Sequence, residues 1–439
     1  MKKELAKGSK KLLFAWAFYD WANSVYSLVI ASAIFPIFYQ GLFRIADIET
    51  LVIFGGEIRS TPLISYVTAA AFLTVAFISP LLSGIADYMG NKKRFMQFFC
   101  LLGSLSCMGL YWFDLEAIYF SLFSYYLALV GFWGSIVFYN SYLPDVAYPE
   151  QQDRVSAKGY SLGYIGGVVL LVFNLAMVLY PGVFGIQGEY PEIQAMKISF
   201  LTVGLWWILF AQYSFYWLPK GQKNGNKITQ RVLLNGFREL QNVQRSLIEN
   251  RVLKRYLLAF FIYSMAVQTV MLVATYFGEQ EIGWSSDSEK TTGLIISILI
   301  IQLVAVLGAG ITARCSEKFG NVPVLIGLNS IWLFVCIVAY FITSPIQFYI
   351  TAGVVGLIMG GIQSLSRSTY SKFLPETKDT TSYFSFYDVA EKIGIVVGMS
   401  LYGVIDQITG SMRNSVLFLV LFFLIGIILL LRIPKKNYI

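Results

Sequence analysis

The stretch Ser83-Gly-Ile-Ala-Asp87-Tyr-Met-Gly90-Asn-Lys92-Lys93-Arg94 ends one apolar run of the sequence and leads into the next. Its acid, glycine and asparagine recur 230 positions later in Glu317-Lys-Phe-Gly320-Asn321, again between two apolar runs. Further matches lie at an offset of 231, where Tyr139, Leu143-Pro144-Asp145, Gly163 and Gly167 recur as Tyr370, Leu374-Pro375-Glu376, Gly394 and Gly398. A string of matches at nearly one spacing indicates that the second half of the chain repeats the first.

The apolar runs on either side of this stretch are long enough to cross a membrane. Hydrophobic residues make up 56% of the 439 residues and charged residues only 13%, about half the charged share of an ordinary soluble protein. A transmembrane helix needs roughly 20 apolar residues. Twelve runs meet this length, near residues 12–39, 62–86, 95–113, 117–143, 159–180, 197–218, 256–277, 291–313, 322–343, 346–367, 382–405 and 413–432. The sequence therefore predicts an all-α integral membrane protein with twelve transmembrane helices in two six-helix repeats.

The basic residues give the orientation of these helices. If both termini lie on the inner side, 27 of the 33 Lys and Arg residues fall on that side, five on the other, and Lys392 within a span. Positive charge is enriched on the cytoplasmic side of membrane proteins. We therefore expect cytoplasmic termini, and we attribute the net charge of +8 to topology and to contact with anionic membrane lipid, not to nucleic acid.

The longest polar stretch, residues 219–255, separates the first six spans from the last six. Leu233, Phe237, Leu240 and Leu247 follow helical spacing within it. We expect an amphipathic helix on the inner leaflet, with a flexible solvated linker as the alternative. The expected domains are an N-terminal half (1–218), this linker (219–255) and a C-terminal half (256–439).

Several kinds of chemistry lack the residues they need. The chain contains no histidine, and its four cysteines form no close pair, so neither a zinc site nor a disulfide framework is expected. No phosphate-binding GxxxxGK[ST] motif is present, and no nucleophile has an evident base. We expect no enzymatic activity, no metal and no cofactor.

The repeat and the quoted loop resemble the major facilitator superfamily of transporters. The superfamily's loop signature is an acid in a tight glycine turn followed by basic residues, and Asp87, Gly90, Lys92 and Lys93 match it. Ser83 replaces the usual first glycine, while Tyr88 and Asn91 replace usual basic residues. The resemblance implies that Asp87 is a conformational latch, with its partner near the start of the eleventh span, around Ser382.

Three further stretches are similar to one branch of that superfamily, which contains the fungal vacuolar amino-acid effluxer linked to autophagy and many bacterial members. The first stretch is Tyr19-Asp20-Trp21-Ala22-Asn23-Ser24 with Phe35-Pro36. The second comprises Tyr139-Asn140 through Leu143-Pro144-Asp145, then Arg154-Val155-Ser156, Gly163-Tyr164 and Gly166-Gly167. The third is Gly360-Gly361-x-Gln363-x-Leu365-Ser366-Arg367-Ser368 with Phe384-x-Phe386-Tyr387. The resemblance covers nearly the whole chain. It implies two halves that rock about a site near the middle of the membrane.

Charged residues inside a membrane span are costly and are functional candidates by default. Asp20 lies in the first span, with Asn23 on the same helix face. Asp388, Glu391 and Lys392 lie in the eleventh span, and their repeat counterparts are uncharged. We expect Asp20 and this cluster to act in cargo binding or ion coupling; the alternative is that Asp388 and Lys392 form a structural pair four residues apart.

Arg367 closes the tenth span next to Gln363, and its guanidinium could receive a cargo carboxylate. It could equally anchor the helix end at the membrane surface. Trp21 is a candidate for the pocket wall, with the aromatic belt at the membrane interface as the alternative.

These features favour a secondary active transporter that moves a small polar solute, an amino acid in efflux, by alternating access coupled to protons or sodium. The alternatives are a membrane sensor that binds a solute without transporting it and a transporter of drugs, sugars, nucleosides or lipids. A membrane-embedded enzyme is the third hypothesis, and the missing catalytic residues argue against it. We expect a monomer in a bacterial inner membrane, or in a vacuolar or lysosomal membrane if the source is eukaryotic.

Overall fold

The computed structural model describes residues 5–221 and 231–434. In chain order its elements are α1 (Lys10–Val25), η1 (Tyr26–Ile34), α2 (Phe35–Ala46), β1 (Thr50–Ile53), β2 (Gly56–Arg59), α3 (Ser60–Met89), α4 (Lys92–Gly109), η2 (Leu110–Trp112), α5 (Ile118–Asn140), α6 (Leu143–Val146), α7 (Pro149–Leu179), η3 (Pro181–Phe184), α8 (Pro191–Trp217), α9 (Arg231–Glu249), α10 (Arg251–Glu281), α11 (Asp287–Phe319), α12 (Asn321–Ala339), α13 (Pro345–Phe373), α14 (Thr380–Thr409) and α15 (Met412–Leu431).

Twelve long helical segments match the twelve predicted spans. Eleven segments of the described chain are long and apolar enough to cross a membrane, the first being the continuous run α1, η1 and α2. The twelfth is α14, which is 30 residues long and differs from the others because it carries Asp388, Glu391 and Lys392. The predicted all-α membrane fold is confirmed.

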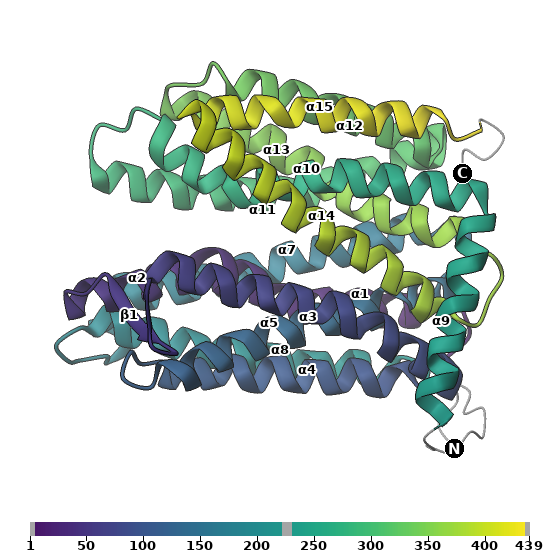
Figure 1. The fold of residues 1–439 in the computed structure, drawn as a ribbon, viewed down its shortest axis with the longest axis horizontal. Coiled ribbons are helices and arrows are strands. Elements are labelled where there is room, and N and C mark those ends of the chain that lie inside the picture. The colour runs from purple at the N-terminus through teal and green to yellow at the C-terminus, as the bar shows by residue number, and fades with distance from the viewer. Residues whose placement is uncertain (1–4, 222–230, 435–439) are drawn as a thin grey trace.

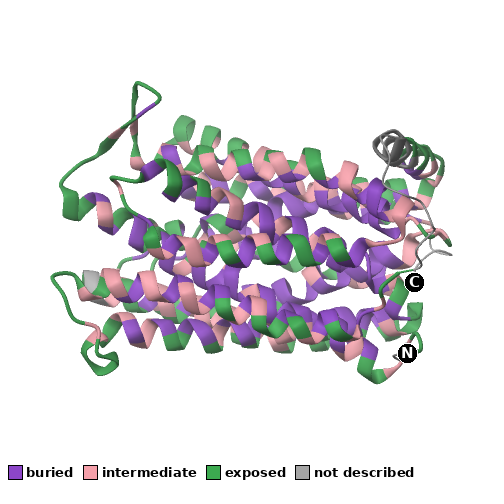
Figure 2. Cartoon of the chain, turned by 90° about the horizontal axis from the view of Figure 1, so that it is seen from below, coloured by how far each residue is buried: buried purple, intermediate pink, exposed green. Residues whose placement is uncertain are grey.

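Figure 1 shows the helices as two groups, with α1 to α8 in one and α10 to α15 in the other. We call these groups the N-terminal half and the C-terminal half. Each surrounds its own hydrophobic core, with Trp207 fully buried in one and Trp332 in the other. Exposed apolar side chains such as Leu307 and Phe334 cover the outside, and Figure 2 shows the buried residues concentrated between the helices. Such a surface suits helices that face lipid.

The two ends of the bundle differ. At one end lie α9, the start of α1 and the end of α15 (Figure 1); we call it the basic end, because it also holds Lys92, Lys93 and Arg154. At the other end β1 and β2 form a short antiparallel hairpin, and we call this the hairpin end. The two names serve below to place each contact along the helices.

The structure differs from the sequence-based expectations in three local features. Most helices extend past the apolar runs; α7 begins at Pro149 and α10 at Arg251, because polar residues can continue a helix into the membrane surface. The hairpin was not predicted; its turn uses Phe54 and Gly55, both with positive φ. The first span changes to a π-helix between α1 and α2, just before Pro36, which cannot donate a backbone hydrogen bond.

The predicted linker helix is present as α9 within the described residues. Val243 and Leu247 are buried, and the helix contacts α3, α10 and α14. Its Ser246 hydroxyl accepts a hydrogen bond of 2.8 Å from Tyr383 on α14. The side chains of Leu233 and Phe237 lie outside the described residues. The part of the segment that forms α9 is therefore a helix packed against the bundle, not the flexible solvated linker given as the alternative.

Candidate functional site

Asp20 on α1 and Arg367 on α13 form a buried ion pair between the two halves. The Arg367 Nη2 and Asp20 Oδ2 atoms are 3.3 Å apart, and the Arg367 and Asp20 side chains are 2% and 10% exposed. The hydroxyl of Tyr139 also donates to Asp20 Oδ2, at 2.8 Å. Sequence reasoning selected Asp20 and Arg367 separately; the structure brings them together.

Arg367 donates all five of its guanidinium hydrogens to the N-terminal half. Nε donates to the Ser156 hydroxyl at 3.0 Å, and Nη2 donates to the Ser156 carbonyl at 3.0 Å. Nη1 donates to Asn140 Oδ1 at 3.2 Å, and both terminal nitrogens donate to Asp20. In this arrangement no donor of Arg367 remains for a cargo.

Aromatic rings lie against this guanidinium. Its carbon lies 4.7 Å from the centre of the Trp16 ring and 4.3 Å from that of Tyr160. Trp16 is held in turn by its indole N–H, which donates to the Tyr139 carbonyl at 2.9 Å. Rings at this distance attract a cation and keep water away from it, so they strengthen the contact between the halves.

Asp388, Glu391 and Lys392 form a second charged cluster, two to three turns from the start of α14. Lys392 Nζ lies 3.0 Å from Asp388 Oδ1 and 2.9 Å from Glu391 Oε2. It also lies 3.6 Å from the centre of the Trp133 ring, which belongs to the N-terminal half. Gln268 Nε2 donates to the other Glu391 oxygen at 2.9 Å. Asp388 Oδ2 is buried and has no hydrogen-bond partner among the described residues.

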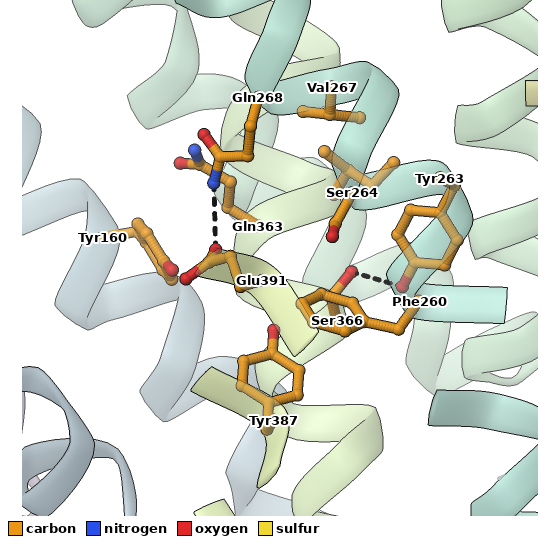
Figure 3. Close-up of a pocket in the computed structure, with 11 residues that line it drawn as sticks. Tyr160, Phe260, Tyr263, Ser264, Val267, Gln268, Gln363, Ser366, Tyr387 and Glu391 are labelled. Carbon is orange, nitrogen blue, oxygen red and sulfur yellow. Dashed lines mark hydrogen bonds between the residues drawn. The ribbon is translucent and has the colours of Figure 1, made fainter. Parts of the chain in front are cut away.

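A small cavity lies beside this cluster (Figure 3). Its volume is about 20 Å³, and Glu391, Gln268, Gln363 and Tyr160 contribute to its wall. In Figure 3 Gln268 and Glu391 face each other, and Tyr160 approaches from α7 in the other half. This space can hold one water molecule. A cargo therefore requires the halves to move apart.

Asp87 contacts the first turn of α14, where it was expected near Ser382. The backbone N–H of Ser382 donates to Asp87 Oδ2 at 2.6 Å, and that of Thr381 donates to Oδ1 at 3.3 Å. The first N–H groups of a helix have no partner within it, and the helix dipole favours a negative charge there. Asp87 thus joins the last turn of α3 to the start of a helix of the other half.

The other residues of the loop signature surround this contact. Gly90 ends α3 with φ of 63°, a backbone conformation that glycine adopts at no steric cost. Lys92 Nζ lies 2.6 Å from Asp145 Oδ2 and donates to the Thr380 hydroxyl at 2.8 Å. Lys93 donates to the Leu218 carbonyl at 2.8 Å. Lys92 therefore contacts both halves, and Lys93 ties α4 to the end of α8.

The repeat of this loop makes an equivalent contact in the other direction. Glu317 on α11, the counterpart of Asp87, pairs with Arg154 on α7. Close by, Asp153 is buried and accepts hydrogen bonds from Lys372 at 2.6 Å, Asn321 at 2.9 Å and Ser316 at 3.0 Å. The two halves are therefore joined at the basic end by two sets of contacts related by the repeat.

Three candidate residues remain: Gln363, Asn23 and Trp21. Gln363 accepts a hydrogen bond of 2.7 Å from Tyr164, which again joins the halves. Asn23 is buried one helical turn from Asp20, and its amide nitrogen has no partner among the described residues. Trp21 packs against Trp206 of α8, with ring centres 5.3 Å apart.

Sequence reasoning did not assign several residues of the site. Tyr139, Asn140 and Ser156 contact the ion pair, and all three lie in the stretches that carry the family resemblance. Trp133 and Asp153 had no such signal. Asp153 lies before the apolar run that predicted the fifth span, so it was counted with a loop.

Three comparisons with known proteins agree with this architecture. A family model described as "Vacuole effluxer Atg22 like" matches residues 8–438. The uncharacterized MFS-type transporter YxiO of Bacillus subtilis is 31% identical over 433 residues, covering 96% of this chain and 95% of that protein. Autophagy-related protein 22 of Saccharomyces cerevisiae is 26% identical over 420 residues, covering 83% of this chain and 75% of its own.

A solved structure shows the same fold. The crystal structure of the major facilitator superfamily transporter FucP in the outward conformation matches with a TM-score of 0.71 at 14% identity, covering 97% of this chain and 98% of that one. With its two groups of membrane helices and a family match over nearly its full length, the chain belongs to the Atg22-like family of major facilitator superfamily transporters.

Proposed function

We propose that the protein is a secondary active transporter that moves small polar solutes, amino acids above all, in efflux by alternating access. The observation that carries the proposal is the buried Asp20–Arg367 pair, whose two charges belong to different halves. Such a pair must separate whenever the halves move apart at the basic end. We infer that the basic end faces the cytoplasm and that this arrangement is the state in which it is closed.

The charges released by this separation suit an amino acid. An unpaired guanidinium and an unpaired carboxylate in a site of low dielectric constant are both costly. A zwitterionic amino acid brings a carboxylate for Arg367 and an ammonium group for Asp20. Cargo binding would then replace the contact that closes the basic end, which links occupancy of the site to the opening of the molecule.

The α14 cluster is the proposed site of ion coupling. One lysine faces two carboxylates, and the Asp388 Oδ2 atom has no hydrogen-bond partner among the described residues. A surplus carboxylate in a buried site favours uptake of a proton or a sodium ion. Its uptake would weaken the hold of Asp388 on Lys392, and Lys392 contacts Trp133 of the other half.

Counterflow in proteoliposomes tests the proposal. Liposomes loaded with an unlabelled amino acid should take up the same amino acid in labelled form, whereas a sensor that does not transport should show no uptake. Because Asp20 is proposed to bind the cargo ammonium group, Asp20→Asn should lose both exchange and accumulation driven by a proton or sodium gradient. The control is Asp47→Asn, at an exposed residue with φ of 54°, a conformation that asparagine tolerates. Gradient-driven accumulation by Asp20→Asn would contradict the assignment.

A double neutral variant tests the coupling cluster. Lys392→Gln alone leaves the buried Asp388 carboxylate without its cation, which costs about 3–5 kcal/mol in comparable sites, whereas Asp388→Asn alone leaves Lys392 paired with Glu391 and should cost less. Adding Asp388→Asn to Lys392→Gln should recover most of the thermal stability that Lys392→Gln loses but not gradient-driven transport. Full transport by the double variant would show that the charges serve only to hold the helix.

A further inference from the structure

A groove at the basic end lies apart from the contacts between the halves. It is found where α9 meets α10 and has a volume of about 520 Å³; its walls are Ile248, Glu249, Arg251, Lys254, Arg255 and Leu258. Three of these side chains are positively charged and one is negatively charged. The groove therefore has a positive potential, which attracts anions.

Four of the wall residues form a stripe along α10. Arg251, Lys254, Arg255 and Leu258 follow the spacing of one helix face, and Leu258 lies about 10 Å along the helix axis from Arg251. Because α10 is a membrane-crossing helix, its charged end lies at the membrane surface and Leu258 lies deeper. Leu258 and Ile248 are both exposed. The stripe is thus basic at the depth of lipid headgroups and apolar at the depth of acyl chains.

The walls of the groove are held in place by the rest of the fold. Arg255 Nη1 donates to the Arg432 carbonyl at 2.8 Å, at the end of α15. Asn250 caps α10 by accepting the Leu253 N–H at 3.1 Å. Arg251 and Lys254 are exposed, and within the described residues neither forms an ion pair. Two cations on a fixed helix end are therefore free to bind an anion.

We propose that this groove binds the headgroup of an anionic phospholipid from the surrounding membrane. The phosphate would lie between Arg251, Lys254 and Arg255, since guanidinium and ammonium groups both bind phosphate oxygens. An acyl chain would follow Leu258 into the membrane. Soluble phosphate could use the cations but not the apolar surface beside them, so the position of Leu258 favours a lipid.

Native mass spectrometry of the full-length protein in detergent tests the proposal. The protein is titrated with phosphatidylglycerol and, in parallel, with phosphatidylcholine. Wild type should bind phosphatidylglycerol in preference, and Arg251→Gln/Lys254→Gln should bind it roughly thirty-fold more weakly, as expected for the loss of two cations near an anionic headgroup. The matched control is Arg314→Gln, at an exposed arginine at the basic end of α11, which should bind like wild type.

Two additional arms distinguish a bound lipid from a bound free phosphate ion. Lys254→Arg keeps the charge and should retain binding, and inorganic phosphate at the lipid concentration should fail to displace phosphatidylglycerol. Equal binding by wild type and the double variant, equal binding of the two lipids, or displacement by phosphate would each overturn the proposal. Thermal unfolding checks that the variants fold; if the double variant does not, Lys254→Gln alone is titrated against the same control.

Discussion

Arg367 donates all five of its guanidinium hydrogens to three residues of the other half. It binds a carboxylate, an amide oxygen, a hydroxyl and a backbone carbonyl at once. A lysine has the same charge but three donors on one nitrogen and no planar fork. The identity of this side chain, and not only its charge, is therefore matched to the closed basic end.

Substitution of Arg367 separates charge from geometry. Arg367→Gln should lower the free energy of unfolding by about 3–5 kcal/mol, because it leaves Asp20 buried without its cation. Arg367→Lys should lose less stability but also lose transport. Adding Asp20→Asn to Arg367→Gln should recover thermal stability without recovering transport. If Arg367→Lys transports at the wild-type rate, the fork geometry is not required.

Gly159 offers a test of the same contact that changes no charge. A Cβ atom at this position would collide with Asp20 Oδ2 and crowd Arg367 Nη2 and the Tyr139 hydroxyl. Gly159→Ala should therefore push the halves apart at the basic end, seen as longer distances between spin labels across it. Gly327→Ala is the control, since a Cβ there meets no atom within 4 Å. Unchanged distances in Gly159→Ala would show that the contact can yield without opening.

At the residue scale, the sequence predicts which polar groups matter but not how they pair. Asp20 and Arg367 are both charged residues in apolar stretches, and the free-energy cost of placing a charge in a membrane identifies them as functional candidates. Their pairing depends on how two helices 347 positions apart in sequence pack together. Helical spacing relates only residues that are close in sequence, so it could not predict that Asp20 and Arg367 lie side by side.

At the scale of elements, α14 packs against α3 and α5 of the N-terminal half and against α10 and α15 of its own half, and its first turn binds Asp87. Asp87 is the acid that holds the first turn. Asp87→Asn removes the charge that the helix N-terminus favours, so we expect a larger population open at the basic end and altered transport. Distance measurements between labels on α3 and α14 check this.

The control for Asp87 keeps the same type of hydrogen bond within one half. Asp114 Oδ1 accepts the backbone N–H of Glu116 at 3.0 Å, so Asp114→Asn should leave the distances unchanged. An Asp87→Asn variant with wild-type transport and wild-type distances would remove Asp87 from the switching mechanism.

Element boundaries explain why one part of the basic end was not predicted. The apolar run that predicts the fifth span begins near 159, whereas α7 begins at Pro149. The intervening polar residues are helical, and Asp153 among them is buried against three donors. A hydropathy criterion detects the part of a helix in lipid and not its polar end, where the contacts between the halves lie.

At the scale of the whole molecule, the charge distribution predicts the orientation of the chain in the membrane. Gln241 on α9 and Val183 near the hairpin end are both exposed. With Cys315 replaced by serine, Gln241→Cys should resist labelling by an impermeant thiol reagent in intact cells, whereas Val183→Cys should react. Labelling of position 241 from outside would reverse the proposed topology.

The overall fold was predictable because membrane helices are detected from composition and length, and the repeat follows from matches at one offset. The hairpin Thr50–Arg59 was not, because its two strands of four residues carry too little alternation to be recognised. The groove beside α10 could not be predicted from the sequence either, since it depends on the angle between α9 and α10.

Helix α14 carries two contacts with the N-terminal half, one at Ser382 and one at Lys392, and their separation relates a tilt of the helix to a movement of its first turn. Ser382, which binds Asp87, and Lys392, which lies over Trp133, are ten residues apart on α14, a separation of about 15 Å along a rigid rod. If α14 tilts by about 10° around Lys392, the first turn moves by about 2.5 Å, enough to break a hydrogen bond. Such a tilt would convert a small change of angle at the charged cluster into a displacement of the first turn of α14 at the membrane surface.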